Sequence, residues 1–362
     1  MIRIASVGYG DIAQRRHFPE LRNLSDKAQL VALAGRDELS LANCAREFDV
    51  PSWYADADQM LAREDIDAVL ILTPPDSHGL FAKKAIEAGK HVLLEKPMVK
   101  SVAEATDLLQ ALKIQQQKKP ITFFPLPHVD IPEHRVVSRL IADGVIGEAT
   151  SVECHRGHRG PTHADWFYKK ELAGGGVLFD LGIYQVSAVV SLFGPAQTVT
   201  ALCNRHFDTR TLDDGKVVEP DVEDSALVSL WLDNRMAVTI NANWNGSVTH
   251  HATRRRVTVI GREGNLHFGV EDGGIYVYRT DGDYGVIQET SEEAAFDGYP
   301  SRRITSDASD IPSTIVGDFV NLVDSGETST RALEMQVHVM EIIFKAYRSG
   351  AANEAQTLMT RF

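Results

Sequence analysis

Short apolar runs alternate with segments of helical spacing along the N-terminal part of the chain. The runs that predict β-strands are Met1–Val7, Gln29–Gly35, Ala68–Thr73 and His91–Leu94. Helical spacing of apolar residues predicts helices up to Leu24 and over Leu39–Phe48, Ala57–Arg63, His78–Ala88 and Val102–Gln116. Strands that alternate with helices are typical of βαβ units, so we expect a parallel, doubly wound α/β sheet.

From about residue 121 the pattern changes to the alternation that is typical of antiparallel strands with one covered face. It is clearest in Arg235–Trp244, where Met236, Val238 and Ile240 alternate with smaller or polar residues. Further strands are expected at Ala226–Leu232, Val257–Ile260 and Asn265–Val270, hairpin ends and a long loop over Gly273–Pro312, and closing helices over Ile315–Val323 and Ala332–Ser349. We therefore expect two domains, residues 1–121 and residues 122–362.

A glycine-rich segment follows the first predicted strand directly. Gly8-Tyr9-Gly10-Asp11-Ile12-Ala13 matches the G-x-G-x-x-G/A pattern of dinucleotide-binding folds. Gly8 permits the tight turn, Gly10 lets the backbone approach a pyrophosphate, and Ala13 lets the helix pack closely on the strand, while N–H groups at the helix start hold the phosphates. A glycine turn used only for its dihedral angles is the alternative, but the strand before it and the helix after it favour dinucleotide binding. The cofactor residues expected here are Gly8, Gly10, Asp11, Ile12 and Ala13.

The residues after the second predicted strand bear on the choice of cofactor. An NAD site is expected to have an acid at this strand end, because a carboxylate accepts hydrogen bonds from the adenosine ribose. Here Gly35-Arg36 occupies the strand end, and Asp37 comes one position later. Arg36 can stack on adenine and pair with a 2′-phosphate. NADP is therefore favoured over NAD, although Asp37 turned toward the ribose would reverse that order.

The charge and the cysteines limit the partners and the compartment. Lys and Arg number 37 and Asp and Glu 50, a formal net charge of −13, and such a surface repels nucleic-acid phosphates and anionic lipid. The longest apolar run near a predicted strand is Ala68–Leu72, far shorter than the ~20 residues of a spanning helix. Three cysteines with neither a C-x-x-C pair nor an even number indicate a reducing cytoplasm. We expect neither a nucleic-acid partner nor a membrane.

Two further strand ends carry motifs of a known family. Thr73-Pro74-Pro75-Asp76-Ser77-His78 closes the third predicted strand, and Lys90-His91-Val92-Leu93-Leu94-Glu95-Lys96-Pro97 closes the fourth. With the glycine segment and Asp165-Trp166-Phe167, they resemble the glucose-fructose oxidoreductase/inositol dehydrogenase/MocA family over essentially the whole chain. The resemblance implies an N-terminal Rossmann domain and a C-terminal α/β domain with a large, mostly antiparallel sheet, through which the chain would form a homodimer or homotetramer. It implies cofactor contacts from Thr73, Pro74, His78, Glu95, Lys96 and Trp166.

Lys96 stands directly after the fourth predicted strand, at the edge where ligands bind in a doubly wound sheet. The following proline keeps Lys96 extended and limits the direction of its side chain. Alternatively, Lys96 is a solvated loop residue without a role in binding. The resemblance implies a catalytic or substrate-orienting group close to the nicotinamide, and a cis peptide bond before Pro97.

A second set of polar residues lies in an apolar segment after the glycine triplet Gly174–Gly176. Asp180 and Tyr184 are four positions apart and so share one face of a helix expected to run to about Phe193. Alternatively, Asp180 and Tyr184 are buried structural residues whose hydrogen bonds go to each other or to the backbone. Most of the resembled family has His at the position of Tyr184 and Asp at that of Ser187, whereas tyrosine is found in the subset that includes dimeric dihydrodiol dehydrogenase.

Hydride transfer to or from an alcohol carbon needs a group that takes or returns the hydroxyl proton. A phenol with its ordinary pKa of about 10 is a poor base, and a nearby ammonium group lowers that pKa. We therefore expect Tyr184 as general acid/base, Lys96 as its tuner and substrate orienter, and Asp180 as a hydrogen-bonding partner of the substrate or the lysine. The function expected is that of an NAD(P)-dependent dehydrogenase or reductase that acts on a carbinol carbon of a sugar, polyol or cyclic diol.

A cluster of histidines follows Cys154, but its spacing matches no closed zinc pattern, and arginine neighbours disfavour a cation. We therefore expect no metal. His155, Arg156 and His158 are instead candidates for substrate contact, and an arginine here can recognise a carboxylate. A surface role without a ligand is equally open.

Two other functions stay open on the sequence alone. The resembled family also contains co-regulators that bind NADP without turnover, although these can lose the catalytic groups that this chain keeps. It also contains enzymes that process glycosides by transient oxidation with a retained NAD. The segment Phe123–His128 departs from the family's Asn/Arg-containing stretch, which leaves the identity of the substrate open.

Overall fold

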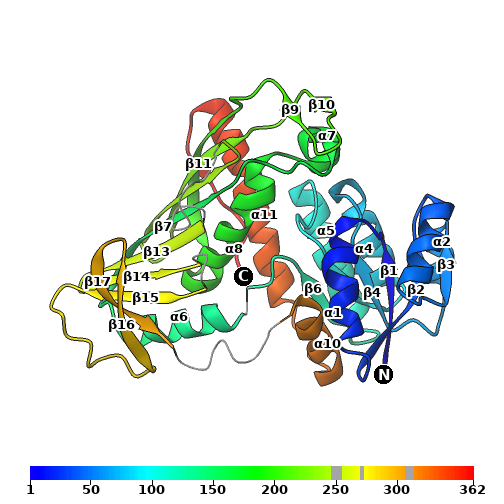
Figure 1. The fold of residues 1–362 in the computed structure, drawn as a ribbon, viewed down its shortest axis with the longest axis horizontal. Helices are drawn as coiled ribbons and strands as arrows, with labels where there is room; N and C mark the ends of the chain where they lie inside the picture. The colour runs from blue at the N-terminus through cyan, green and yellow to red at the C-terminus, as the bar shows by residue number, and fades with distance from the viewer. Residues whose placement is uncertain (130, 246–254, 270–272, 306–313) are drawn as a thin grey trace. The chain divides into compact units, whose positions relative to one another are not determined.

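The computed structural model describes residues 1–129, 131–245, 255–269, 273–305 and 314–362 (Figure 1). Contacts between residues divide the chain into two compact units. The first contains Met1–His128, Ser313–Met340 and Phe362, and the second contains Val129–Pro312 and Glu341–Arg361. Helix α11 (Arg331–Ala352) therefore contributes residues to both units. The functional domains 1–121 and 122–362 stay a prediction.

A six-stranded parallel sheet forms the centre of the first unit, with the order β3-β2-β1-β4-β5-β6. The strands are β1 (Ile2–Val7), β2 (Ala28–Ala34), β3 (Ser52–Tyr54), β4 (Ala68–Ile71), β5 (His91–Leu94) and β6 (Phe123–Pro125). The doubly wound sheet predicted from the hydrophobic pattern is confirmed, although the pattern does not predict the short edge strands β3 and β6. The order switches between β1 and β4, and in such sheets ligands bind outside the carboxyl ends of the strands at the switch point.

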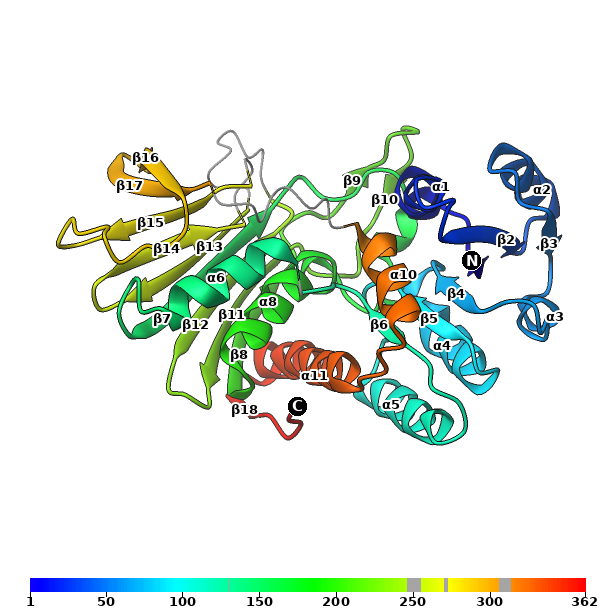
Figure 2. The ribbon, with the colours of Figure 1, turned by 90° about the horizontal axis from the view of Figure 1, so that it is seen from below.

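Helices cover both faces of this sheet (Figures 1 and 2). They are the π-helical turn η1 (Ala13–His17), α1 (Phe18–Arg22), α2 (Glu38–Glu47), α3 (Ala57–Leu61), the 3-10 turn η2 (Pro75–Ser77), α4 (His78–Glu87), α5 (Val102–Gln116) and α10 (Ile315–Ser325). Because both faces are covered, strand residues such as Ile4, Leu33 and Leu70 are fully buried. Phe319 of α10 packs on Phe124 of β6 with 5.9 Å between ring centroids, which places α10 in the first unit despite its distance along the chain.

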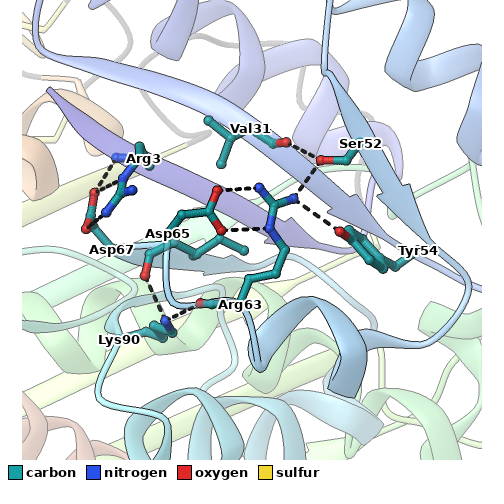
Figure 3. A network of polar contacts seen from close by, with 9 residues as sticks. Arg3, Val31, Ser52, Tyr54, Arg63, Asp65, Asp67 and Lys90 are labelled. Carbon is teal, nitrogen blue, oxygen red and sulfur yellow. Dashed lines mark hydrogen bonds and ion pairs between the residues drawn. The ribbon is translucent and has the colours of Figure 1, made fainter.

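A network of ion pairs and hydrogen bonds lies at the amino ends of β1, β4 and β5 (Figure 3). The backbone N–H of Arg3 donates to Asp67 at 2.8 Å, and its guanidinium donates to the same carboxylate at 3.0 and 2.8 Å. The ammonium group of Lys90 donates to the carbonyls of Arg63 and Ile66 at 2.6 and 2.8 Å. The loop before β4 is thus tied to both neighbouring strands, at the sheet edge opposite to that of the glycine segment.

Replacing Asp67 with Asn is expected to lower the melting temperature at neutral pH by about 1–3 °C, because the pair is partly exposed and screened. The hydrogen bond from Arg3 holds the pKa of Asp67 below its ordinary value. The pair therefore stabilises the fold above about pH 4, and this contribution is lost as the pH falls through the lowered pKa. Thermal melts over a pH series should show the difference between D67N and wild type shrinking in acid. A pH-independent difference would contradict the role of the charge.

A ten-stranded sheet forms the second unit, with the order β16-β17-β15-β14-β13-β7-β12-β11-β8-β18. Its strands are β7 (Ala149–Gly157), β8 (Ala196–Asn204), β11 (Ser225–Leu232), β12 (Ala237–Asn243), β13 (Arg255–Gly261), β14 (Gly264–Phe268), β15 (Ile275–Arg279), β16 (Ser291–Phe296), β17 (Tyr299–Ile304) and β18 (Gln356–Thr357), and β9 (Arg210–Thr211) pairs separately with β10 (Val217–Val218). Neighbouring strands run antiparallel except β7 and β12, which are parallel, so the expected large, mostly antiparallel sheet is confirmed.

Helices α6 (Pro132–Ala142), α8 (Ile183–Phe193) and α11 lie along one face of this sheet (Figure 2). Strands β11 and β12 alternate buried and exposed residues, as their sequence predicts. On the exposed side of β8 and β11, Leu202, Leu227 and Trp231 are 57%, 47% and 45% exposed. One face of the sheet is therefore covered by helices, and large apolar side chains lie on the other.

The prediction of hairpin ends and a long loop over Gly273–Pro312 is wrong in part, because strands β15, β16 and β17 lie there. Strands β16 and β17 form a hairpin, and β17 pairs with β15. Residues 306–312 of that range, and residue 270 of the predicted strand before it, lie outside the described residues. Strand β16 is at the sheet edge and buries none of its residues fully, so it has no apolar alternation to reveal it.

One segment in the described part of the chain, Lys170–Phe193, is long and apolar enough to cross a membrane by length and composition. It contains α8, and 72% of its most apolar window is buried within the fold. Burial of this kind is typical of the core helix of a folded domain.

Candidate active site

The glycine segment joins β1 to the turn η1 at the switch point of the first sheet. Gly8 has φ +97°, and a Cβ there would lie 2.6 Å from the carbonyl carbon and oxygen of Leu72, so only glycine fits. A Cβ on Gly10 would meet nothing within 4 Å. The N–H of Gln14 bonds to the carbonyl of Gly10 at 3.2 Å, so the N–H groups before Gln14 precede the helical bonding of this turn. Open space beside such N–H groups fits a dinucleotide pyrophosphate.

The end of β2 places Tyr9 and Asp37 in defined structural roles. The ring of Tyr9 packs on Gly35, where a Cβ would lie 2.2 Å from Cε1, and its hydroxyl donates to the carbonyl of Asp37 at 3.1 Å. The Asp37 carboxylate caps α2 by accepting from the N–H of Ser40 at 2.9 Å, and this bond lowers the pKa of Asp37. Arg36, between Gly35 and Asp37 in the sequence, is exposed.

Glu95 and Lys96 follow β5, and a buried histidine holds the glutamate. The Nε2 atom of His17, a fully buried residue of η1, lies 2.9 Å from Oε1 of Glu95. The other carboxylate oxygen accepts from the backbone N–H of Lys96 at 2.8 Å. Burial acts to raise the pKa of Glu95, but the bond to His17 and the charge of Lys96 hold it below its ordinary value. The Lys96–Pro97 peptide bond is cis, as expected.

His78 begins α4 and is buried beneath the ends of β4 and β5. Its Nδ1 atom lies 2.7 Å from the carbonyl oxygen of Pro97, and its Nε2 atom lies 2.7 Å from the carbonyl oxygen of Thr73. The hydroxyl of Ser77 donates to that of Thr73 at 2.9 Å. His78 therefore binds the backbone on both sides, while Thr73 and Pro74 are half-buried.

In the second unit, the glycine triplet is required by close contacts. A Cβ on Gly175 would lie 2.2 Å from the hydroxyl of Tyr347, and one on Gly176 would lie 1.9 Å from the carbonyl oxygen of Glu223. The Glu223 carboxylate accepts from the N–H groups of Gly176 and Leu178 at 3.0 Å and from the Tyr347 hydroxyl at 2.6 Å. Burial raises the pKa of Glu223 and that of Tyr347. These bonds determine where the π-helical turn η4 (Leu178–Gly182) begins.

Asp180 and Tyr184 each contact a basic side chain from β7 or from the segment after it. The indole N–H of Trp244 donates to Asp180 at 3.3 Å, and Nε2 of His158 lies 3.8 Å from the same oxygen. The Arg156 guanidinium lies over the Tyr184 ring, 4.1 Å from its centroid. The structure thus brings together four of the predicted residues, Asp180, Tyr184, Arg156 and His158, within the second unit.

Two other predicted residues lie in different surroundings. His155 precedes Arg156 on β7, so its side chain points to the opposite face of the sheet, and it lies opposite Arg256 of β13 in the register. Burial lowers the pKa of His155. Trp166, in the 3-10 turn η3 (Asp165–Tyr168), stacks on Phe167 with 3.8 Å between ring centroids. Over the described ranges, no group of three His, Cys, Asp or Glu residues is placed to hold a metal.

Three residues of these sites, His17, Glu223 and Trp244, are not identified by sequence reasoning. The one local signal among them is that of His17, a histidine on the buried face of the turn that follows the glycine segment. Glu223 and Trp244 reach their partners across the fold, at 47 and 64 positions along the chain, and no spacing rule connects them.

Models of known protein families match segments of both units. A family model described as "Oxidoreductase family, NAD-binding Rossmann fold" matches residues 2–122, and one described as "GFO/IDH/MocA C-terminal domain" matches residues 134–267. An uncharacterized oxidoreductase of Synechocystis is 31% identical over 282 residues, which cover 76% of this chain and 74% of that protein. The chain belongs to the Gfo/Idh/MocA oxidoreductase family. Its first unit is accordingly an NAD-binding Rossmann fold, and the protein is an oxidoreductase.

Two relatives of this Gfo/Idh/MocA protein have named activities. A dTDP-3,4-didehydro-2,6-dideoxy-alpha-D-glucose 3-reductase of Streptomyces antibioticus is 32% identical over 197 residues, 54% of this chain and 57% of the relative. A levoglucosan dehydrogenase, solved in complex with NADH and L-sorbose, has a TM-score of 0.83 at 18% identity and covers 99% of both chains. At that identity the second likeness concerns the fold alone.

The glycine segment yields a prediction that separates folding from cofactor binding. Gly8→Ala is expected to destabilise the protein by about 1–3 kcal/mol, because a side chain there meets both the positive φ and the Leu72 backbone. Gly10→Ala should leave the melting temperature nearly unchanged, because its Cβ enters open space, yet weaken NADH and NADPH binding by obstructing the pyrophosphate. Thermal melts and fluorescence titrations measure the two effects. Unchanged cofactor affinity in G10A would contradict the phosphate site.

Proposed function

We propose that this oxidoreductase uses NAD(P) to transfer a hydride between the nicotinamide and a carbinol carbon of a sugar, polyol or cyclic diol. Family membership supports the reaction type. The name of the dTDP-sugar reductase supports a sugar-like substrate. The observation that carries the proposal is the placement of Tyr184, a phenol at the start of α8 with the Arg156 guanidinium 4.1 Å above its ring.

The cofactor residues proposed for the first unit lie at the carboxyl ends of its strands. The backbone at Gly10, Asp11, Ile12 and Ala13 would hold the pyrophosphate, since the space beside Gly10 is open. Thr73, Pro74, His78, Glu95 and Lys96 are proposed for the nicotinamide half, and Trp166 is proposed as a further cofactor residue. When bound, the nicotinamide gives a hydride to the substrate carbon or takes one from it.

The residues of the second unit are proposed to handle the proton. Tyr184 takes the hydroxyl proton of the substrate during oxidation and returns it during reduction. Because a phenol ordinarily has a pKa of about 10, positive charge nearby is needed to make its anion available. Arg156 supports this requirement, and Lys96 is proposed to orient the substrate oxygen and to add a second charge. Asp180 is proposed to accept a hydrogen bond from a substrate hydroxyl.

Tyr184→Phe tests the acid/base assignment. Loss of the hydroxyl is expected to lower kcat by about 100-fold or more, because proton transfer of this kind contributes about 10²–10⁴ in rate. The affinity for NADPH, measured by fluorescence titration, should stay close to that of wild type. Tyr299→Phe, at a residue that is 64% exposed, serves as the matched control. Full activity in Y184F on the best substrate of an aldose, polyol and diol panel would refute the assignment.

The end of β2 supports NADP as the preferred cofactor. Asp37, the first acid after the end of β2, is engaged in capping α2. Arg36 is exposed beside it and presents a guanidinium that suits a 2′-phosphate. Both features favour a phosphorylated ribose over a free one.

Arg36→Ala is therefore expected to weaken NADPH binding about tenfold, the loss of one charge-assisted pair, and to leave NADH binding nearly unchanged. Titrations of wild type and R36A with both cofactors, at low and high salt, measure the difference. The salt dependence of NADPH binding should fall in the variant, because a charge pair has been removed. A wild-type protein that binds NADH more tightly than NADPH would contradict this preference.

Self-association through the open face of the second sheet and a cytoplasmic location are also proposed. Leu202 and Leu227 lie directly opposite each other on β8 and β11, with Trp231 farther along β11. Exposed apolar groups of this size are typical of interfaces, which supports a homodimer or homotetramer. Cys44 and Cys154 are buried free thiols and Cys203 is a half-buried one, which agrees with a reducing compartment.

Two results of the same substrate panel would replace this proposal. Tight NADPH binding without turnover on any member would favour a non-catalytic regulator of this fold. Cofactor that remains bound through purification, with substrate consumed but no net change in nicotinamide absorbance, would favour a glycoside-processing enzyme with retained NAD.

A further inference from the structure

His78 differs from the other buried histidine beside the Glu95–Pro97 segment in what its ring nitrogens face. His17 meets one acceptor, Glu95, at Nε2, while its Nδ1 has no hydrogen-bond partner among the described residues. His78 meets an acceptor at each nitrogen, the carbonyl oxygens of Pro97 and Thr73, both at 2.7 Å. Neither carbonyl oxygen can donate a proton.

A neutral imidazole has one N–H donor and one lone pair. If His78 were neutral, a nitrogen lone pair would stand 2.7 Å from a carbonyl lone pair, and that contact would be repulsive rather than a hydrogen bond. An imidazolium donates from both nitrogens and satisfies both carbonyls. Charged donors also form the shorter and stronger hydrogen bonds, which agrees with the short contact on each side.

We propose that His78 is a buried imidazolium that binds the carbonyls of Thr73 and Pro97 together and thereby positions Lys96. Thr73 follows β4, and Pro97 directly follows Lys96 after β5. The ring thus connects the segment after β4 to the segment after β5. The Glu95 carboxylate in addition accepts from the N–H of Lys96. His78 is a positioning residue, and its effect on turnover rests on the function proposed for Lys96.

Two carboxylates act on His78, and further charged groups lie next to its neighbours. Asp76 of η2 and Glu95 at the end of β5 favour the charged ring, and Glu95 is itself held by His17 of η1. From α5, the carboxylate of Glu104 lies beside Gly79, the residue after His78, at 3.1 Å from the site of a Cβ. Lys96 directly precedes Pro97, whose carbonyl oxygen faces Nδ1 of His78.

Burial acts against this charge and holds the pKa of His78 below its ordinary value, although the two carbonyls and the two nearby carboxylates act to raise it. The proposal is that the hydrogen-bond geometry prevails over burial. A charged ring is stabilised by two donated bonds and an adjacent anion, whereas a neutral ring must lose one of the two strand-end contacts.

Nitrogen NMR of the full-length protein labelled with ¹⁵N-histidine tests the charge directly, without any substrate. The His78 signals are assigned as those missing from the spectrum of His78→Gln. Both ring nitrogens should show imidazolium shifts from about pH 6 to pH 9, a range in which an ordinary histidine becomes neutral. One pyrrole-like and one pyridine-like nitrogen at neutral pH would overturn the proposal.

Kinetics test the positioning role. His78→Gln offers a single donor group and should lower kcat by about 100-fold through displacement of Lys96, with a smaller change in the NADPH dissociation constant. His91→Gln is the matched control, because His91 is partly buried at the other end of β5 and accepts from the N–H of Thr122, a role that glutamine can fill. A lower melting temperature with unchanged kcat in H78Q would show a merely structural role and refute the positioning.

The two proposals fail in different ways. A wild-type protein without turnover on the whole panel, but with imidazolium shifts at His78, would refute the proposed function and leave the assignment of charge standing. An active wild type with a neutral His78 would refute the inference and leave the function standing. Loss of NADPH binding in H78Q would also count against it, since the cofactor site is then lost rather than Lys96 displaced.

Discussion

The close approach of Gly8 to the backbone of Leu72 is the contact on which the site of the first unit depends. It brings the carboxyl ends of β1 and β4 together at the switch point, and a methyl group at 2.6 Å from a carbonyl would force them apart. From there the chain passes through Thr73 to His78, whose ring reaches the end of β5 at Pro97. Three strand ends are thus held together, β1 and β4 by a backbone contact and β4 and β5 through the His78 ring.

The second unit uses the same physical device at a different place. Gly176 lies against the Glu223 carbonyl, and the Glu223 carboxylate binds two backbone N–H groups at the start of η4. In both units a glycine allows two backbone segments to touch, and a π-helical turn follows, η1 in the first and η4 in the second. Such turns are frequent at functional sites, and here Asp180 lies within η4 and Tyr184 directly after it, at the start of α8.

Local charge prevails over net charge at these sites. The protein has a net charge of −13, which would repel an anionic cofactor from a distance. Over short distances, backbone N–H groups at the glycine segment, Arg36 at the end of β2 and Lys96 after β5 are local sources of positive potential. In the second unit, the Arg156 guanidinium places positive charge over the Tyr184 ring. Net charge therefore bears on the kind of partner, while the local potential depends on where these few groups lie.

The sequence by itself determined the Rossmann sheet, the glycine segment and the strand-end positions of Thr73 and Lys96, because these depend on periodicity and on motifs a few residues long. It did not reveal β16, a polar edge strand with little buried surface. Only the tertiary structure decided that His17 meets Glu95 across 78 positions, that Tyr347 meets Glu223 across 124, and that Arg156 covers Tyr184. Partners so distant along the chain are selected by packing, which acts on neighbours in space and leaves no regular spacing in the sequence.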